Sequence, residues 1–150
     1  MERISNSDLP AGLMETMLNV ENYLAKCGLD TILLELLRTR VSQINGCAYC
    51  LDMHFKEAVH AGEDPIRLIS LPAWRDTPYY TPREQAVLAF AESLTTTPGK
   101  EHNDDLHSEL LKHFSKQEIA LLTLAVAQIN SWNRITRSFG TIPGNYQVKK

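Results

Sequence analysis

The chain has 150 residues, of which 43% are hydrophobic and 22% charged, with three cysteines and a formal net charge of −3. These values are typical of one globular domain over residues 1–150, and an acidic chain without a dense Lys/Arg stripe argues against nucleic-acid binding. No apolar run approaches the roughly 18 residues of a membrane span, and the N-terminus lacks the apolar stretch of a secretory signal. We therefore expect a cytoplasmic protein with no membrane segment.

Helical periodicity and capping residues predict an all-α fold of six to seven helices. Two capping boxes, Thr81 to Glu84 and Ser115 to Glu118, mark helix starts, and glycines such as Gly62 and Gly140 mark helix ends. In chain order the expected helices cover residues 10–27, 31–44, 47–61, 65–70, 82–94, 104–113 (capped by Asn103) and 116–139. No alternating pattern typical of strands competes with them.

The last helix and one loop carry more apolar side chains than a solvated surface needs. The first half of helix 116–139 is apolar on most faces, so we expect it to form the centre of the core or to bury one side against another subunit. Loop 71–80 holds Trp74, Tyr79 and Tyr80, which we expect to pack as a lid or an interface patch, with a role as a substrate wall left open.

Cys47, Cys50 and His54 are the residues that most clearly indicate chemistry. On a helix their side chains point within about 60° of one another. Two thiols three residues apart have Cα atoms about 5 Å apart, which a disulfide can close. His54 lies one turn beyond Cys50 and can take its proton directly or through a water. The spacing predicts a redox site.

The predicted chemistry depends on the thiolate of Cys50. A free thiol has a pKa of about 8.5 and is only about 3% ionised at pH 7, so the site must stabilise the anion. The first turn of a helix favours an anion, and His54 supplies a base. Cys47 can then convert an oxidised Cys50 into an intramolecular disulfide.

Glu35 is the candidate third member of this group. The Asn45-Gly46 break folds helix 31–44 back against helix 47–61, and residues equidistant from the turn face each other. Glu35 then lies roughly level with His54 and can orient its imidazole. Arg38 or Arg40 on the same helix can instead pair with Glu35 structurally.

Simpler interpretations remain open at this point. Cys47, Cys50 and His54 can form part of a zinc site, although His60 lies on another helix face and no second Cys-x-x-Cys supplies the missing ligand. The two cysteines can also be core residues.

Residues outside the motif have structural interpretations. Cys27 is expected to be a core thiol, because it sits near a helix end without a partner. The remaining histidines are expected at the surface; they are His60, His102, His107 and His113.

At this point the chain resembles a known family. The pattern is Glu35 followed by Arg40-x-Ser42-x-x-Asn45-x-Cys47-x-Tyr49-Cys50-x-x-x-His54. It is similar to the signature of the alkylhydroperoxidase D-like (AhpD-like) branch of the carboxymuconolactone decarboxylase family, and the run Asn130-Ser131-Trp132-Asn133-Arg134 also resembles single-domain members. The resemblance covers about residues 10–140.

The resemblance implies a helical fold that assembles as a trimer or hexamer, and a thiol peroxidase or disulfide reductase without metal or bound cofactor beyond a redox-active Cys47–Cys50 disulfide. By similarity, Cys50 is the peroxidatic thiol, Cys47 the resolving thiol, and His54 with Glu35 the proton relay. Tyr49 stands where some members carry a further histidine. The implied partners are a hydroperoxide and a lipoyl-type dithiol or thioredoxin-like reductant.

Three other functions stay open. One is a thiol–disulfide oxidoreductase with little peroxidase activity. The others are a lyase like that of the sister decarboxylase branch, and a zinc or redox-sensor module.

Overall fold

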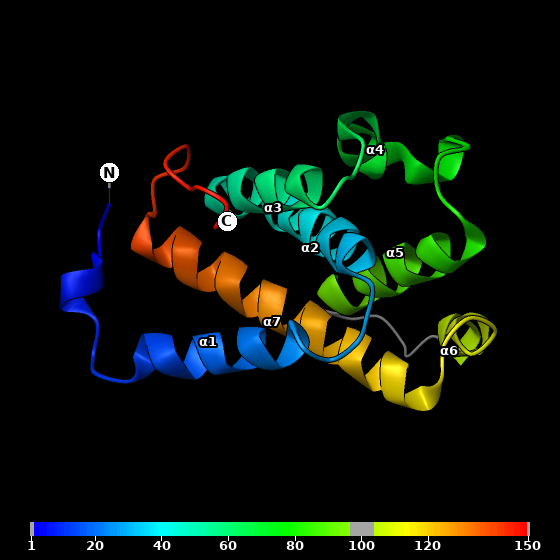
Figure 1. The fold of residues 1–150 in the computed structure, drawn as a ribbon, viewed down its shortest axis with the longest axis horizontal. Helices are drawn as coiled ribbons and strands as arrows, with labels where there is room; N and C mark the ends of the chain where they lie inside the picture. Colours follow the sequence, from blue (N-terminus) through cyan, green and yellow to red (C-terminus); the bar gives the residue numbers. More distant parts are fainter. Residues whose placement is uncertain (1, 97–103, 150) are drawn as a thin grey trace.

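A computed structural model describes residues 2–96 and 104–149 of the chain. Within these residues the structure contains seven α-helices, two short 3₁₀ helices and no strand, which confirms the all-α prediction (Figure 1). The elements are η1 (Asn6–Asp8), α1 (Leu13–Leu24), α2 (Thr31–Asn45), α3 (Ala48–His60), α4 (Pro65–Ser70), η2 (Leu71–Asp76), α5 (Pro82–Thr95), α6 (Asp104–Leu110) and α7 (Lys116–Phe139).

The antiparallel pair α2 and α3 is the scaffold of the molecule. Gly46 adopts the left-handed conformation (φ 63°, ψ 40°) that ends α2, a conformation that costs a residue with a side chain more than it costs glycine. The backbone N–H of Cys47 then donates to the carbonyl of Ser42 at 3.1 Å, which closes the turn. As a result α3 starts directly beside the end of α2, as predicted.

The long helix α7 lies across α2 and is flanked by α1 (Figure 1). Its buried apolar residues meet those of α2 and α5 in the larger core cluster; they are Ile119, Leu122, Ala125, Val126 and Ile129. This confirms the prediction of a central core helix. Cys27 is a half-buried free thiol that packs against the same cluster.

The N-terminal helix is shorter than predicted. Gly12 has a φ of 86° and forms the N-cap, so α1 begins at Leu13 rather than near Pro10. At its other end α1 stops at Leu24, and the backbone passes through a turn to Gly28. Periodicity alone overestimated the helix because apolar spacing continues through both turns.

The helix predicted to reach about His113 also ends early. Beyond Leu110 the chain tightens into turns in which the N–H groups of Lys112 and His113 bond three residues back, the latter to Leu110 at 3.0 Å. The predicted cap Asn103 and His102 lie outside the described residues. His60 and His107 are exposed and His113 is half-buried.

The prediction for the aromatic segment 71–80 was wrong. It contains η2 instead of an irregular loop, and Trp74 and Tyr80 are only 5% and 4% exposed. Both belong to a second core cluster between α2, α3, α4 and α5, so they form neither a lid nor a substrate wall. Of the three aromatic residues in this segment, Tyr79 is the exposed one, at 41%.

The C-terminal segment folds back along α3 (Figure 1). The Lys56 ammonium group donates to the carbonyls of Gly144 and Tyr146 at 3.2 and 3.0 Å, and the N–H of Gly144 donates to Asp52 at 3.1 Å. These contacts bring Tyr146 next to residues from the middle of the chain. Among the described residues, no helix combines the length and the hydropathy needed to span a membrane.

Candidate active site

Cys47 and Cys50 form a disulfide at the start of α3. Their sulfur atoms are 2.09 Å apart and their Cα atoms 5.3 Å apart. Cys47 is the N-cap of α3 rather than its first helical residue, and its sulfur accepts the N–H of Cys50 at 3.3 Å. Both residues are almost completely buried. The sequence spacing correctly placed the two sulfurs within bonding distance.

Side-chain amides attach the turn before Cys47 to α7. Asn45 donates to the side-chain oxygens of Asn133 at 2.8 Å and Asn130 at 3.0 Å. Asn133, which is fully buried, donates in turn to the Ser42 hydroxyl at 3.1 Å. Because buried amides are stabilising only when they are paired, this network fixes the turn in one position.

Thr136 of α7 is a site residue that the sequence did not reveal. Its hydroxyl oxygen lies 3.0 Å from the sulfur of Cys47 and 3.2 Å from that of Cys50. It also donates to the carbonyl of Trp132 at 2.8 Å. The available cue was its position three residues after Asn133, on the same helix face.

The structure brings Glu35 and His54 together, as the hairpin register predicted. His54 Nδ1 lies 2.8 Å from a Glu35 carboxylate oxygen, and both residues are buried. The carboxylate accepts only, so Nδ1 donates its proton to Glu35, and Nε2 is the ring atom that can gain or lose a proton. Arg38 binds the other Glu35 oxygen at 2.7 Å, whereas Arg40 pairs with Glu92. Glu35 therefore has both of the partner types considered from sequence.

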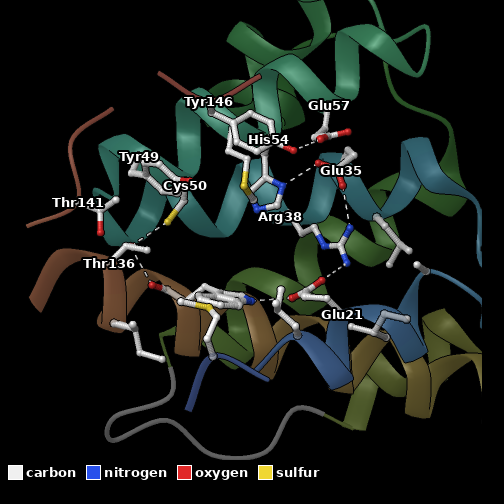
Figure 2. Close-up of a pocket in the computed structure, with 18 of the residues that line it drawn as sticks. Glu21, Glu35, Arg38, Tyr49, Cys50, His54, Glu57, Thr136, Thr141 and Tyr146 are labelled. Atoms are coloured by element: carbon white, nitrogen blue, oxygen red, sulfur yellow. Dashed lines mark hydrogen bonds and ion pairs between the residues drawn. The ribbon is translucent and has the colours of Figure 1, made fainter. Parts of the chain in front are cut away.

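The charged network extends beyond Glu35 to two further helices (Figure 2). Arg38 also pairs with Glu21 of α1 at 3.0 Å, and Glu21 accepts the indole N–H of Trp132 at 2.8 Å. Burial by itself raises the pKa of Glu35, but the hydrogen bond and charge of His54 and those of Arg38 outweigh burial. The pKa of Glu35 therefore lies below its usual value, and the carboxylate is ionised at neutral pH.

A cavity of about 580 Å³ connects Cys50 with this network. Cys50 and His54 both line it, and Figure 2 shows the His54 ring between Cys50 and Glu35 in this view. Among the described contacts none is a hydrogen bond from His54 to Cys50, so a bridging molecule is needed for proton transfer between them. Much of the remaining wall is apolar, including Met14, Leu18, Leu34, Met53, Ile135 and Phe139.

Tyr146 reaches this cavity from the C-terminal segment. Its hydroxyl donates to the Glu57 carboxylate on α3. Burial raises the pKa of Tyr146, and the hydrogen bond and charge of Glu57 raise it further. The phenol is therefore neutral at physiological pH, and its hydrogen bond to Glu57 attaches the C-terminal segment to α3 at the cavity wall.

The sequence left a zinc site open as an alternative. Among the described residues, no group of three or more His, Cys, Asp or Glu side chains is arranged to hold a metal ion. His60, the nearest further histidine in sequence, is exposed at the end of α3.

Comparisons with known proteins place this site in a family context. The model of the carboxymuconolactone decarboxylase family matches residues 11–93. The uncharacterised protein YdfG of Bacillus subtilis is 36% identical over 139 residues, which cover 93% of this chain and 95% of YdfG.

Solved structures share the fold. One is a protein of unknown function from Agrobacterium tumefaciens with a suggested identity as the antioxidant defence protein AhpD. It is 34% identical with a TM-score of 0.92, covering 97% of this chain and 100% of that one. The debrominase Bmp8 has a TM-score of 0.79 at 18% identity, covering 89% and 72%, and at this identity the likeness concerns the fold alone. The family match, the relatives and the helical architecture together show that this chain belongs to the AhpD-like branch of the carboxymuconolactone decarboxylase family.

Proposed function

We propose that this protein is a thiol-dependent oxidoreductase that reduces organic hydroperoxides through Cys47 and Cys50. The observation that carries the proposal is the shared cavity wall. Cys50, disulfide-bonded to Cys47, and a carboxylate-oriented histidine line the same largely apolar space. The family membership and the antioxidant role suggested for the Agrobacterium protein also support a redox function.

The proposed cycle starts from the reduced protein. The Cys50 thiolate attacks the terminal oxygen of the hydroperoxide, the O–O bond breaks, and the alkoxide takes a proton to leave as an alcohol. Cys50 is then a sulfenic acid. Cys47 attacks its sulfur, water leaves, and the disulfide seen in the structure forms. A dithiol returns both cysteines to the thiol state by exchange.

His54 would act as the general base and then the general acid in this cycle. Because Glu35 holds Nδ1, the basic Nε2 can accept the Cys50 proton and later deliver it to the departing alkoxide. Without a direct His54–Cys50 hydrogen bond, the hydroperoxide itself or a water would complete the path. Arg38 keeps Glu35 charged, and so favours the imidazolium that forms during transfer.

Stopped-flow oxidation of the reduced protein by cumene hydroperoxide tests the proposal. We expect rapid loss of free Cys50 thiol in the wild type and a roughly 100-fold slower reaction in His54→Ala. His60→Ala is the matched control, because His60 is exposed and outside the cavity. Oxidation no faster than that of free cysteine in the wild type would refute the peroxidase proposal.

The same apparatus ranks the alternative functions. Rapid oxidation by small disulfides such as oxidised lipoamide, combined with slow reaction with hydroperoxide, would assign a thiol–disulfide oxidoreductase instead. Turnover of a cyclic lactone that survives Cys50→Ser would assign lyase chemistry.

We also propose that copies of the chain associate. Phe55 and Val59 on α3 and Ile66 and Ile69 on α4 are large apolar side chains that are 39% to 72% exposed. Exposed apolar groups of this size favour burial against another protein surface. Light scattering after size exclusion should give a trimer or hexamer, and Ile69→Asp should lower the mass, with Leu111→Asp as control.

A further inference from the structure

The disulfide separates two cavities. Cys50 is on the wall of the cavity of about 580 Å³ already described, whereas Cys47 is on the wall of a second, more open cavity of about 370 Å³. Tyr49, Thr136 and Thr141 line both, so they form the partition. The two bonded cysteines therefore line two different, adjacent cavities.

The two cavities differ in charge. Among the described residues, the charged side chains on the wall of the larger one are four glutamates and one arginine; they are Glu2, Glu21, Glu35, Glu57 and Arg38. The smaller one is lined by Arg3 and Arg137, and among the described residues its lining contains no carboxylate. A negatively charged molecule is thus disfavoured on the Cys50 side and favoured on the Cys47 side.

Both arginines of the smaller cavity bond to neutral groups. Arg3 donates to the carbonyls of Arg137 and Ser138, the latter at 2.8 Å. Arg137 donates to the carbonyl of Asn45 at 2.9 Å. Within the described part of the chain, no carboxylate lies at ion-pair distance from either guanidinium, so the two positive charges are held in place without compensation. The N-terminal end of α3, a 13-residue helix, adds to the positive potential.

We propose that the smaller cavity is the docking site of the reductant, a dithiol that carries negative charge near its sulfur pair. This inference rests on the proposed function, because it assigns the step that reopens the disulfide. One thiolate of the dithiol attacks the Cys47 sulfur. The Cys47–Cys50 bond breaks, a mixed disulfide forms on Cys47, and Cys50 leaves as a thiolate. The second thiol then attacks the reductant's own bound sulfur, closes the dithiol into a cyclic disulfide, and releases Cys47, which takes up a proton.

Attack at Cys47 also regenerates the reactive group directly. The departing sulfur is Cys50, which shares a cavity wall with His54 and becomes the thiolate that the next hydroperoxide meets. Oxidant and reductant use opposite sides of the partition, so bound reductant does not block the larger cavity.

A pair of dithiols that differ in charge tests the docking site. Dihydrolipoate carries a carboxylate, whereas dihydrolipoamide has the same dithiol without the charge. We expect the oxidised wild type to be reduced about threefold faster by dihydrolipoate, as one surface charge contact allows, and the preference to fade in 0.5 M salt. The ratio of the two rates is the readout, because changes in folding or sulfur reactivity affect both dithiols alike.

Variants of Arg137 then locate the charge. Arg137→Gln should bring the rate ratio close to one, and Arg137→Lys should restore it. Arg134→Gln is the matched control, because Arg134 is an exposed arginine one turn away on α7 that does not line the smaller cavity. A wild-type ratio of one, or a ratio that Arg137→Gln leaves unchanged, would overturn the docking site.

A trapping experiment identifies the sulfur that is attacked. The oxidised Cys27→Ser protein is mixed briefly with glutathione, which has a net negative charge, then quenched in acid, alkylated and digested for mass spectrometry. We expect glutathione on Cys47 and the alkyl group on Cys50, and the reverse assignment would overturn the inference. If hydroperoxide fails to oxidise the reduced protein, the proposed function fails; equal rates for both dithiols with normal oxidation refute the docking site alone.

Discussion

The two ends of the larger cavity are built differently. At the His54 end, four helices contribute a continuous chain of paired groups from His54 through Glu35, Arg38 and Glu21 to Trp132. At the sulfur end, a single hydroxyl, that of Thr136, contacts both sulfurs. The charges at the first end are already paired, whereas the sulfur end has, among the described residues, one polar side-chain contact for a charge on sulfur.

The two ends suit two different steps, proton transfer at His54 and bond formation at sulfur. A fully paired network holds His54 in one tautomer and position, which proton transfer requires. The sulfur end must remain accessible to change, because bonds to sulfur form and break there. We therefore expect substitutions at the sulfur end to alter reactivity, and substitutions at the His54 end to alter both reactivity and stability.

Removing a sulfur should have the largest effect. Cys50→Ser is expected to lower hydroperoxide turnover by at least about 1,000-fold, because the nucleophile is lost. Cys47→Ser should permit one turnover and then accumulate sulfenic acid on Cys50, since nothing resolves it. Dimedone labelling followed by mass spectrometry measures this product. Equal activity in the wild type and Cys50→Ser would show that the sulfur end is not the reactive end.

Glu35→Gln, at the His54 end, should lower both the stability of the protein and its rate of reaction with hydroperoxide. It leaves Arg38 with one carboxylate partner and His54 without an anionic one, so we expect about 3 kcal/mol less unfolding free energy in urea. The rate of hydroperoxide reaction should fall about 10- to 100-fold.

Glu92→Gln separates the two effects of the Glu35 substitution. Glu92 also holds two arginines, at 2.7 Å to Arg40 and 2.7 Å to Arg75, but it does not line the cavity. It should lose stability while keeping the rate within about twofold. Equal loss of rate in both variants would mean that Glu35 acts only through folding.

The sequence predicted the His54 end better than the sulfur end. Glu35 and His54 belong to adjacent helices joined by a short turn, eleven residues before and eight residues after Gly46, so counting placed them within about one helical turn of the same level. Thr136 lies 86 residues from Cys50, and its contact depends on how α7 crosses the hairpin. Glu21 and Tyr146 likewise reach the cavity from elements whose packing no local pattern specifies. Trp74 was misplaced for a similar reason, since its indole partner Glu92 is 18 residues away.

Thr136→Val tests whether the hydroxyl stabilises charge on sulfur. In the reduced protein the single hydroxyl proton, which the Trp132 carbonyl accepts in this structure, can turn to the Cys50 thiolate. Valine keeps the shape and removes that proton, so the midpoint of the pH profile for Cys50 alkylation in the reduced protein should rise by about one pH unit. Thr123→Val is the control, because Thr123 makes the same hydrogen bond to the carbonyl four residues back, at 2.8 Å, on an exposed turn of α7. Identical profiles for the wild type and Thr136→Val would assign Thr136 a packing role.

The smallest effect concerns stability in acid. The pKa of Glu35 is lowered in the folded protein, so its contribution to stability is complete above the unfolded value of 4.5 and is lost as pH falls through the folded value. Unfolding free energy measured between about pH 5 and 3 should therefore decline less steeply in Glu35→Gln than in the wild type. Parallel slopes would place the source of acid sensitivity elsewhere in the chain.

The amide network around Asn45 should affect how long the enzyme stays active when peroxide is abundant. Asn130 and Asn133 hold the turn in place, so the Cys47 sulfur stays beside Cys50 at a high effective concentration. The disulfide can therefore form without a preceding backbone rearrangement. A sulfenic acid that is consumed this quickly has little time to meet a second peroxide and become an irreversible sulfinic acid. Removing the amide contacts of that turn, for example with Asn45→Ala, would reduce the number of catalytic cycles that each molecule completes before it is irreversibly oxidised.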